Sequence, residues 1–289
     1  MGCTEQKAKD PKQEVREKIH SSSLIVWDKT IHNMTRIFSV EDREEVTPPT
    51  SGRTMSSSSF PSPRAGFEKW FAAEKLPWGL LTPVMECYNS CNLTIWLLDN
   101  SSGMKIRDSH SSTSSNGGGE ESLDNVSRWH ELRDCISFHS HMASKCWIRT
   151  NYWLVNDDSN GHEDTKFKLC CGNPEDVHDE MSHLKSALKQ ATLSQDICPL
   201  SDQLHKIGKK VSKLPKGERV KLVICTQGIP TDRHGGDFWL EIRELSKLDV
   251  KIIIRLCTDL EDVFDLYNTM DARFDNVDVI DDYWCEVSA

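Results

Sequence analysis

The sequence predicts an α/β fold: a doubly wound, mostly parallel sheet with helices on both faces, preceded by a disordered N-terminal arm. Three segments, 93–98, 220–226 and 250–257, are dominated by apolar residues, as strands buried on both faces of a parallel sheet are. Stretches with apolar residues at helical spacing alternate with these segments. Alternation of strand and helix is typical of the α/β class.

The chain is predicted to divide at about residue 66. Residues 1–66 mix charge with Ser and Pro and end in a Ser- and Pro-rich run, which is typical of a flexible linker. Residues 67–289 are predicted to form one folded domain, long enough to bury a substantial core. The arm has ten Lys and Arg against nine Asp and Glu, so the net charge of −10 leaves −11 for the domain. A domain this acidic is not expected to bind nucleic acid.

In the first half of the domain, aromatic residues cluster at 67–80 ahead of the first strand. Further on, the Ser- and Gly-rich run 108–121 indicates a loop. Ser127 is a favourable N-cap for the helix that follows it. In chain order, the predicted elements are a short helix around 85–88, a strand at 93–98, a helix at 129–143, a strand at 146–155 and its hairpin partner at 166–171.

The second half repeats one pattern, in which a helix precedes a buried strand. Turn residues separate the elements, including the Gly-Ile-Pro-Thr-Asp run at 228–232. The predicted elements are helices at 175–191 and 200–214, a strand at 220–226, a helix at 237–247, a strand at 250–257, a helix at 260–270 and a last strand at 277–280.

The junction after the first strand carries the most chemical information. There the chain reads Asp99-Asn-Ser-Ser-Gly-Met, which places a carboxylate at the carboxyl edge of the predicted sheet. Open α/β sheets bind their ligands at that edge. A carboxylate followed by two hydroxyls in an Asp-x-Ser-x-Ser pattern supplies hard oxygen ligands to a divalent cation. Here Gly103 stands at the third position and has no side-chain oxygen, so the pattern indicates a cation site that has decayed.

Three segments together resemble the von Willebrand factor A (vWA) domain family, over about residues 80–280. The segment 97–104 is similar to the family's hydrophobic-Asp-x-Ser-Gly-Ser-Met motif. A Cys-Pro-Leu run at 198–200 stands where the family usually has Thr-Pro-Leu, and it follows a predicted helix. The segment 223–232 is similar to the family's strand followed by Thr-Asp-Gly-x-Pro-Thr-Asp.

The resemblance implies that these three loops build one site, which in the family holds Mg²⁺ and leaves a position open for a carboxylate of a protein partner. Asp99 and Ser101 match the family's ligands, whereas Gly103, Cys198 and Gln227 replace a Ser, a Thr and an Asp. A thiol is a poor ligand for so hard an ion. The residues at this degenerate edge are Asp99, Ser101, Ser102, Gly103, Cys198, Gln227 and Asp232.

The expected function is therefore non-catalytic protein–protein interaction, as a scaffold or regulator, through this edge and without a metal or another cofactor. Ser102 in a shifted loop and the neutral oxygen of Gln227 leave a Mg²⁺-dependent binder as the alternative, with Asp99 and Ser101 as its ligands. A purely structural role is also open for Asp99, whose carboxylate could accept hydrogen bonds from Ser101 and Thr226.

Two further classes of function match part of the sequence. A haloacid-dehalogenase-like phosphohydrolase would share the fold, Thr226 and an acidic pair, Asp281 and Asp282, but it needs a second Asp as general acid where this chain has Ser101. A zinc site lacks a Cys-x-x-Cys pair. Its candidate ligands would be His139, His141, Cys170, Cys171, His178 and His183.

The sequence also suggests a compartment. Eleven cysteines are an odd number, and Cys225 and Cys257 lie in apolar strands, so we expect reduced thiols and a cytoplasmic protein. No run of 18 apolar residues is present, so no transmembrane helix is expected. Gly2 and Cys3 are candidates for myristoylation and palmitoylation, which would attach the chain to a membrane, although Gln6 stands where the pattern has Ser or Thr.

Overall fold

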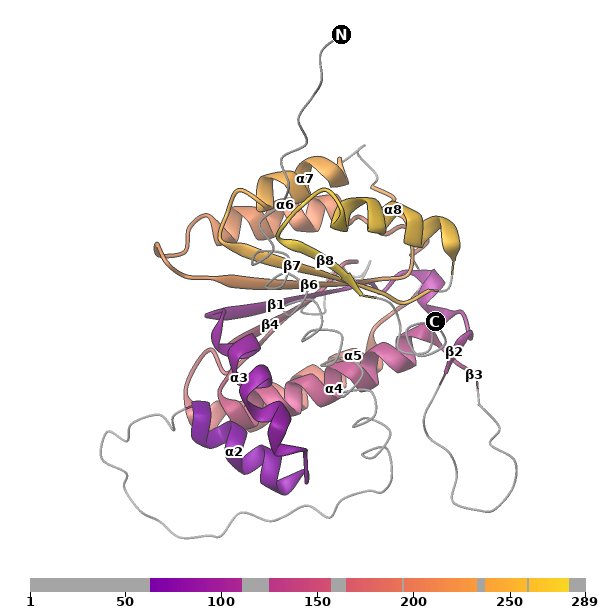
Figure 1. Ribbon diagram of the computed structural model, residues 1–289. Helices are drawn as coiled ribbons and strands as arrows, with labels where there is room; N and C mark the ends of the chain where they lie inside the picture. Colours follow the sequence, from indigo (N-terminus) through magenta and orange to yellow (C-terminus); the bar gives the residue numbers. More distant parts are fainter. Residues whose placement is uncertain are drawn as a thin grey trace.

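The structure is a computed structural model, and it describes residues 63–110, 125–156, 165–193, 195–232, 237–258 and 260–280. These residues form a six-stranded, mostly parallel sheet with helices packed against it (Figure 1), so the predicted α/β class is confirmed. Of the predicted arm, residues 63–66 are described, and they begin helix α2, Pro63–Ala73. None of the described helices is both long and apolar enough to cross a membrane.

The sheet has the strand order β5-β4-β1-β6-β7-β8. Its neighbouring strands are parallel except for β4 and β5, which pair antiparallel as the predicted hairpin. The strands are β1 (Leu93–Leu98), β4 (Thr150–Leu154), β5 (Lys166–Leu169), β6 (Val220–Thr226), β7 (Val250–Leu256) and β8 (Val277–Ile280). Two short strands, β2 (Ser109–His110) and β3 (Asn125–Val126), form a separate antiparallel pair.

Helices lie on both sides of the sheet (Figure 1). The lower layer in that view contains α2, α3 (Leu81–Asn89), α4 (Arg128–Cys146) and α5 (Val177–Gln190). The upper layer contains α6 (Leu200–Val211), α7 (Phe238–Leu245) and α8 (Glu261–Asp271). Three short 3₁₀ helices are η1 (Trp78–Leu80), η2 (Ser102–Lys105) and η3 (Pro174–Asp176).

Strand β1 supplies side chains to two hydrophobic cores. All six of its residues are buried. Trp96 and Leu98 belong to the core shared with the lower helices, and Ile95 and Leu97 belong to the core shared with the upper helices. Side chains of a strand alternate between the two faces of a sheet, so a strand buried on both faces is mostly apolar, and in β1 the exception is the buried Thr94. This explains why five of the six residues at 93–98 are apolar.

The largest difference from the predicted boundaries is at the end of α4. Ser127 does cap α4, since its hydroxyl accepts a hydrogen bond from the backbone N–H of His130 at 3.2 Å. The helix, however, continues to Cys146, which we predicted to begin the next strand. Cys146 is buried against the lower core, and Trp147 ends the helix in the left-handed conformation, with φ of 56°. A short apolar run serves a buried helix face as well as a strand, so its periodicity did not separate the two.

A polar pair is buried in the lower core. The phenol oxygen of Tyr88 on α3 lies 3.1 Å from Nδ1 of His139 on α4, and both residues are buried. Burial lowers the pKa of His139 to about 3, and the positive charges on Arg255 and Lys221 act in the same direction. The imidazole is therefore neutral at pH 7. The ring of Trp96 covers it, with 4.8 Å between ring centroids.

This buried imidazole predicts a pH dependence of stability. Below the ordinary histidine pKa of about 6.5 the unfolded chain binds a proton at His139 that the folded chain refuses. The free energy of unfolding should therefore fall as the pH drops from about 7 to about 5, with a contribution that approaches about 1.4 kcal/mol per pH unit. In His139→Gln that contribution should be lost, as measured by urea unfolding at a series of pH values.

The control is His205→Gln. His205 is exposed on α6 and faces Glu241 at 3.3 Å, so its replacement should leave the slope close to that of the wild type. Equal slopes for the wild type and His139→Gln would show that His139 takes up its proton in the folded chain, contrary to the burial argument.

Candidate functional site

The candidate site lies where β1 and β6 end side by side. Leu98 pairs with Cys225 across the two strands, and the N–H of Asp99 donates to the carbonyl of Cys225 at 2.9 Å. The chain after β1 continues into the lower layer, and the chain after β6 continues into the upper layer (Figure 1). Loops that leave neighbouring strands toward opposite faces open a crevice at the carboxyl edge of a sheet.

Asp99 is fully buried, and its carboxylate is bound by both loops. One oxygen, Oδ1, accepts a hydrogen bond from the N–H of Ser101 at 2.8 Å. The other, Oδ2, accepts from the hydroxyl of Thr226 at 3.1 Å and from the N–H of Gln227 at 3.3 Å. A buried carboxylate needs such donors because water cannot reach it. Asp99 thus ties the end of β1 to the end of β6, as the structural alternative requires.

Gln227 fills the space beside the first loop. Its side-chain nitrogen is 3.5 Å from the hydroxyl oxygen of Ser101. A Cβ atom added to Gly103 would lie only 2.6 Å from Oε1 of Gln227 and closer still to its Nε2. Gly103 and Gln227 are therefore complementary in shape. Because Gly103 has no side chain, the side chain of Gln227 fits beside it.

Arg128, the first residue of α4, holds Gln227 in this position. Its guanidinium donates to Oε1 of Gln227 at 3.0 Å. The same group donates to both carboxylate oxygens of Asp108, from Nε at 2.8 Å and from a terminal nitrogen. Arg128 is 3 % exposed, and its hydrogen bonds to Asp108 and Gln227 fix the orientation of the guanidinium. A positive charge of the protein itself is thereby fixed at the edge of the sheet.

Ser102 and Cys198, the other two predicted residues of these loops, contact different partners. Ser102 donates its hydroxyl to Asp196 at 2.6 Å, so the structure ties it to the segment before α6. Cys198 is buried, and its sulfur lies 3.9 Å from the hydroxyl of Thr226. Burial raises the pKa of the Cys198 thiol well above its usual range, and the charge on Asp99 raises it further. A thiol is also a poor ligand for an ion as hard as Mg²⁺.

Asp232 lies in the loop after β6 and binds the first turn of α6. Its carboxylate accepts a hydrogen bond from the hydroxyl of Ser201 at 2.6 Å and from the N–H of Asp202 at 3.3 Å. A carboxylate at a helix N-terminus satisfies free backbone N–H groups and interacts favourably with the helix dipole. The structure thus brings Asp99, Ser101, Gly103 and Gln227 into direct neighbourhood and uses Asp232 to fasten the β6–α7 loop to α6.

Three polar residues of this edge were missed from the sequence. Asn100 accepts a hydrogen bond from the N–H of Asn156 at 2.8 Å and donates to its carbonyl at 3.1 Å, which joins the ends of β1 and β4. Arg128 is the third. Asn156 follows a predicted strand, as Asp99 does, so polar residues at strand ends were an available signal. No local pattern pointed to the pairing of Arg128 with Gln227.

Some residues of the rival sites lie within the described part of the chain, and others lie outside it. The described residues contain no group of three or more His, Cys, Asp or Glu side chains placed to hold a metal ion. Of the proposed zinc ligands, His139 is buried against Tyr88, and His183 lies edge-on to Phe167 with 5.3 Å between centroids. The acidic pair of the phosphohydrolase hypothesis and the acylation candidates Gly2 and Cys3 lie outside the described residues.

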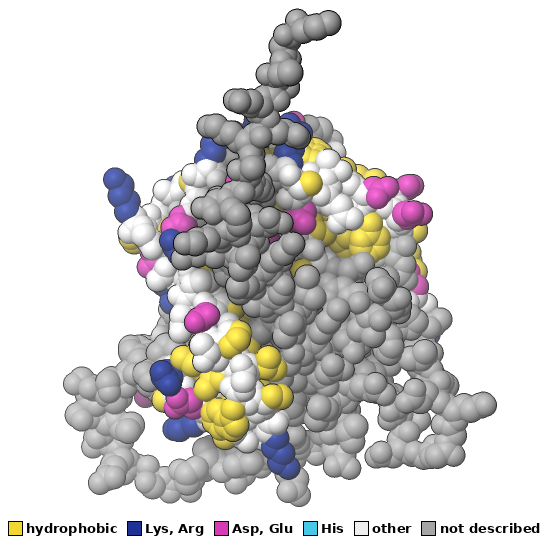
Figure 2. Space-filling model, in the orientation of Figure 1, with side chains coloured by type: hydrophobic (Ala, Val, Ile, Leu, Met, Phe, Trp, Pro, Cys, Tyr) yellow, Lys and Arg dark blue, Asp and Glu magenta, His cyan; other side chains and the backbone are white. Residues whose placement is uncertain are grey.

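A groove of about 490 Å³ opens beside this edge, between the β6–α7 loop and the upper helices. Ile229 at its rim is 52 % exposed, and Trp239 on α7 packs against Phe274 and Arg273. Figure 2 shows hydrophobic side chains next to acidic ones in the upper layer, over α8. The lining residues are Ile229, Pro230, Thr231, Asp232, Asp237, Phe238, Trp239 and Leu266.

Comparison with models of known protein families and with curated proteins gives no match to this sequence. Function must therefore be inferred from the geometry of the chain itself.

The fit between Gly103 and Gln227 predicts a specific cost. Gly103→Ser should lower the free energy of unfolding by about 1–3 kcal/mol, because the new side chain displaces Gln227 from Arg128 and overpacks the site. Gly103→Ser combined with Gln227→Ala should recover most of that loss. Denaturant unfolding of the single and double variants measures both values.

Gly79→Ser is the matched control, because a Cβ atom at Gly79 meets no atom within 4 Å. It should change the free energy of unfolding by less than about 0.5 kcal/mol. If Gly103→Ser were equally harmless, Gln227 would be free to leave the position described above.

Proposed function

We propose that residues 67–289 are a vWA-like domain that binds a protein partner at the carboxyl edge of its sheet, without a metal and without catalysis. The observation that carries this proposal is the side chain of Gln227, which is held by Arg128 against Ser101 and Gly103. In the resembling family this part of the edge belongs to a Mg²⁺ ion. Here the chain fills it with its own atoms.

The strand order supports the doubly wound vWA-like type. Numbered along the chain within the main sheet, the strands lie in the order 3-2-1-4-5-6, which is the doubly wound arrangement. The order reverses at β1, beside β6, which is the switch point where such folds bind ligands. Asp99, Ser101 and Gln227 all lie at this point.

The groove indicates the chemistry of the partner. Ile229 and Trp239 offer apolar surface, while Asp232 and Asp237 add negative charge. We propose a partner surface that presents an apolar side chain beside a Lys or Arg. Apolar anchors give affinity when they are buried in such grooves, and opposite charges at the rim favour the correct orientation.

Two other functions rank lower. A Mg²⁺-dependent vWA domain would keep Asp99 and Ser101 as ligands, but Gln227 would first have to break its hydrogen bond to Arg128. A haloacid-dehalogenase-like phosphohydrolase has its nucleophile position at Asp99, which is fully buried and already accepts three hydrogen bonds. The second carboxylate that such an enzyme needs is absent, since residue 101 is Ser.

The proposal of a metal-independent domain predicts how metal affects stability. The melting temperature of the natural chain should be the same in EDTA and in millimolar Mg²⁺ or Mn²⁺. The triple variant Gly103→Ser, Cys198→Thr, Gln227→Asp restores the family's oxygen ligands and removes the side chain that fills the site. A cation at about 100 times its dissociation constant should then add about 2.7 kcal/mol, or roughly 5–10 °C.

The measurement is thermal unfolding of the full chain and of the variant, each with and without the cation. A shift in the natural chain would favour the Mg²⁺-dependent alternative. No shift in either protein would remove the main support for the vWA resemblance.

Binding at the edge can be tested with a photo-crosslinking amino acid at position 229 of the full chain. We expect discrete protein adducts that persist in EDTA. The control is the same amino acid at position 216, which is exposed at the opposite, amino-terminal end of β6. Adducts that disappear in EDTA, or that are identical at the two positions, would contradict a metal-free interface at this edge.

A further inference from the structure

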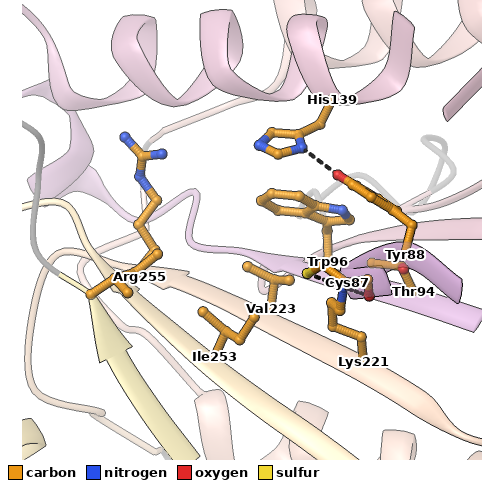
Figure 3. A pocket seen from close by; sticks show the side chains of 10 residues that line it. Cys87, Tyr88, Thr94, Trp96, His139, Lys221, Val223, Ile253 and Arg255 are labelled. Carbon is orange, nitrogen blue, oxygen red and sulfur yellow. Dashed lines mark hydrogen bonds between the residues drawn. The ribbon is translucent and has the colours of Figure 1, made fainter. Parts of the chain in front are cut away.

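A small pocket lies on the lower face of the sheet, between α3, α4 and the strands (Figure 3). Its lining includes Cys87 and Tyr88 of α3 and Lys221 and Val223 of β6. Its volume is about 50 Å³, which is too small for a typical organic ligand. A water molecule needs only about 10–15 Å³ of such space. The pocket therefore admits a molecule of the size of water or hydrogen peroxide.

Lys221 brings an amine into this pocket from a fully buried strand. All seven residues of β6 are buried, and Lys221 is 5 % exposed. Its ammonium donates to the carbonyl of Cys87 at 2.8 Å and to the sulfur of Cys87 at 3.2 Å (Figure 3). Within the described residues, no carboxylate lies at ion-pair distance from Lys221. The backbone of Cys87 thus holds the lysine nitrogen beside the sulfur of the same residue.

Cys87 can be reached by a small reagent. It is partly exposed and lies in the last turn of α3. Cys91, four residues later, is partly exposed as well, but its sulfur lies 3.6 Å from the hydroxyl of Ser90. The two thiols therefore have similar access and different neighbours, an amine in one case and a hydroxyl in the other.

We propose that Cys87 and Lys221 are a modification site, at which hydrogen peroxide induces a reversible covalent N–S cross-link. In the first step the thiol of Cys87 and hydrogen peroxide give a sulfenic acid and water, so the sulfur is oxidised by two electrons and the O–O bond of the peroxide is reduced.

In the second step Lys221 displaces the hydroxyl group from this sulfur. The ammonium releases one proton to solvent, and its nitrogen then attacks the sulfur atom. The N–S bond forms, the S–O bond breaks, and a second proton from the nitrogen leaves with the hydroxyl group as water. The product is a sulfenamide, the class of compound that sulfenic acids form with a neighbouring nitrogen. Two equivalents of an added thiol return the thiol of Cys87 and the amine of Lys221 and are themselves joined as a disulfide.

The cross-link has two consequences for the fold. It joins α3 to β6 across 134 positions of the sequence, so α3 is fastened covalently to the sheet. It also replaces the ammonium by a neutral group. A buried ammonium without a carboxylate is costly, so the loss of its charge favours the product.

A tryptic map of the full chain after treatment with hydrogen peroxide tests the proposal. The protein is denatured, its free thiols are blocked with iodoacetamide, and the digest is analysed by mass spectrometry. Trypsin should fail to cleave after Lys221 in the cross-linked chains. Peptide 76–105, which contains Cys87, should then be joined to peptide 220–233, with a mass two hydrogen atoms below the sum of the two. Dithiothreitol added before digestion should restore cleavage after Lys221.

The map distinguishes this link from a disulfide between Cys87 and Cys225, which would join the same stretches of sequence. Such a disulfide leaves cleavage after Lys221 intact and protects Cys225 from iodoacetamide. Cleavage after Lys251 is the internal control. Lys251 pairs with Lys221 in the register of β6 and β7, but it contacts Asp278 at 2.8 Å, so peroxide should leave its cleavage unchanged.

Three variants define the result. Cys91→Ser should keep the cross-link, and Cys87→Ser should lose it. Lys221→Gln should also lose it, and the labelling of Cys87 by dimedone, which traps sulfenic acids, should rise several-fold because no amine consumes the intermediate. Oxidation of Cys87 with unchanged cleavage after Lys221 would overturn the proposal, as would oxidation confined to Cys91. If Lys221→Gln fails to fold, the map of the natural chain decides alone, since it needs no substitution.

Discussion

The carboxylate of Asp99 is the constraint on which the carboxyl edge of this domain depends. It is fully buried, and it is tolerable there only because Ser101, Thr226 and Gln227 donate hydrogen bonds to it. These donors come from the loops after β1 and β6, so the same interaction fixes both loops. Their positions in turn determine where Gln227 lies.

At this edge a positive charge of the chain itself joins neighbouring segments. In the resembling family a metal ion joins the loops, whereas here Arg128 reaches from α4 to Gln227 and Asp108. A guanidinium makes directional hydrogen bonds and cannot be removed by a chelator or exchanged with solvent. A partner that binds at this edge would meet a permanent surface, on which Ile229 and Trp239 supply apolar area.

Much of the fold was predictable, because the apolar runs of β1, β6 and β7 are long and serve both cores. Local capping was predictable as well, since Ser127 acts on residues three positions away. The error at Cys146 came from an apolar run too short to distinguish helix from strand. At the site, Asp99 could be found from its place after a strand. The contact of Arg128 with Gln227 spans 99 residues, and no local periodicity encodes such a pairing.

Strand β6 has a further consequence for how the molecule would respond to mutation. Lys221 and Val223 near its beginning line the pocket on one face, while Leu222 and Ile224 belong to the core of the other, and Thr226 at its end binds Asp99. Residues of both hydrophobic cores and of the carboxyl edge thus stand within one strand of seven residues. Substitutions in β6 should be pleiotropic, whereas those in α3 or α7 should affect the pocket or the edge separately. Genetic separation of the pocket from the edge is therefore to be sought in the helices.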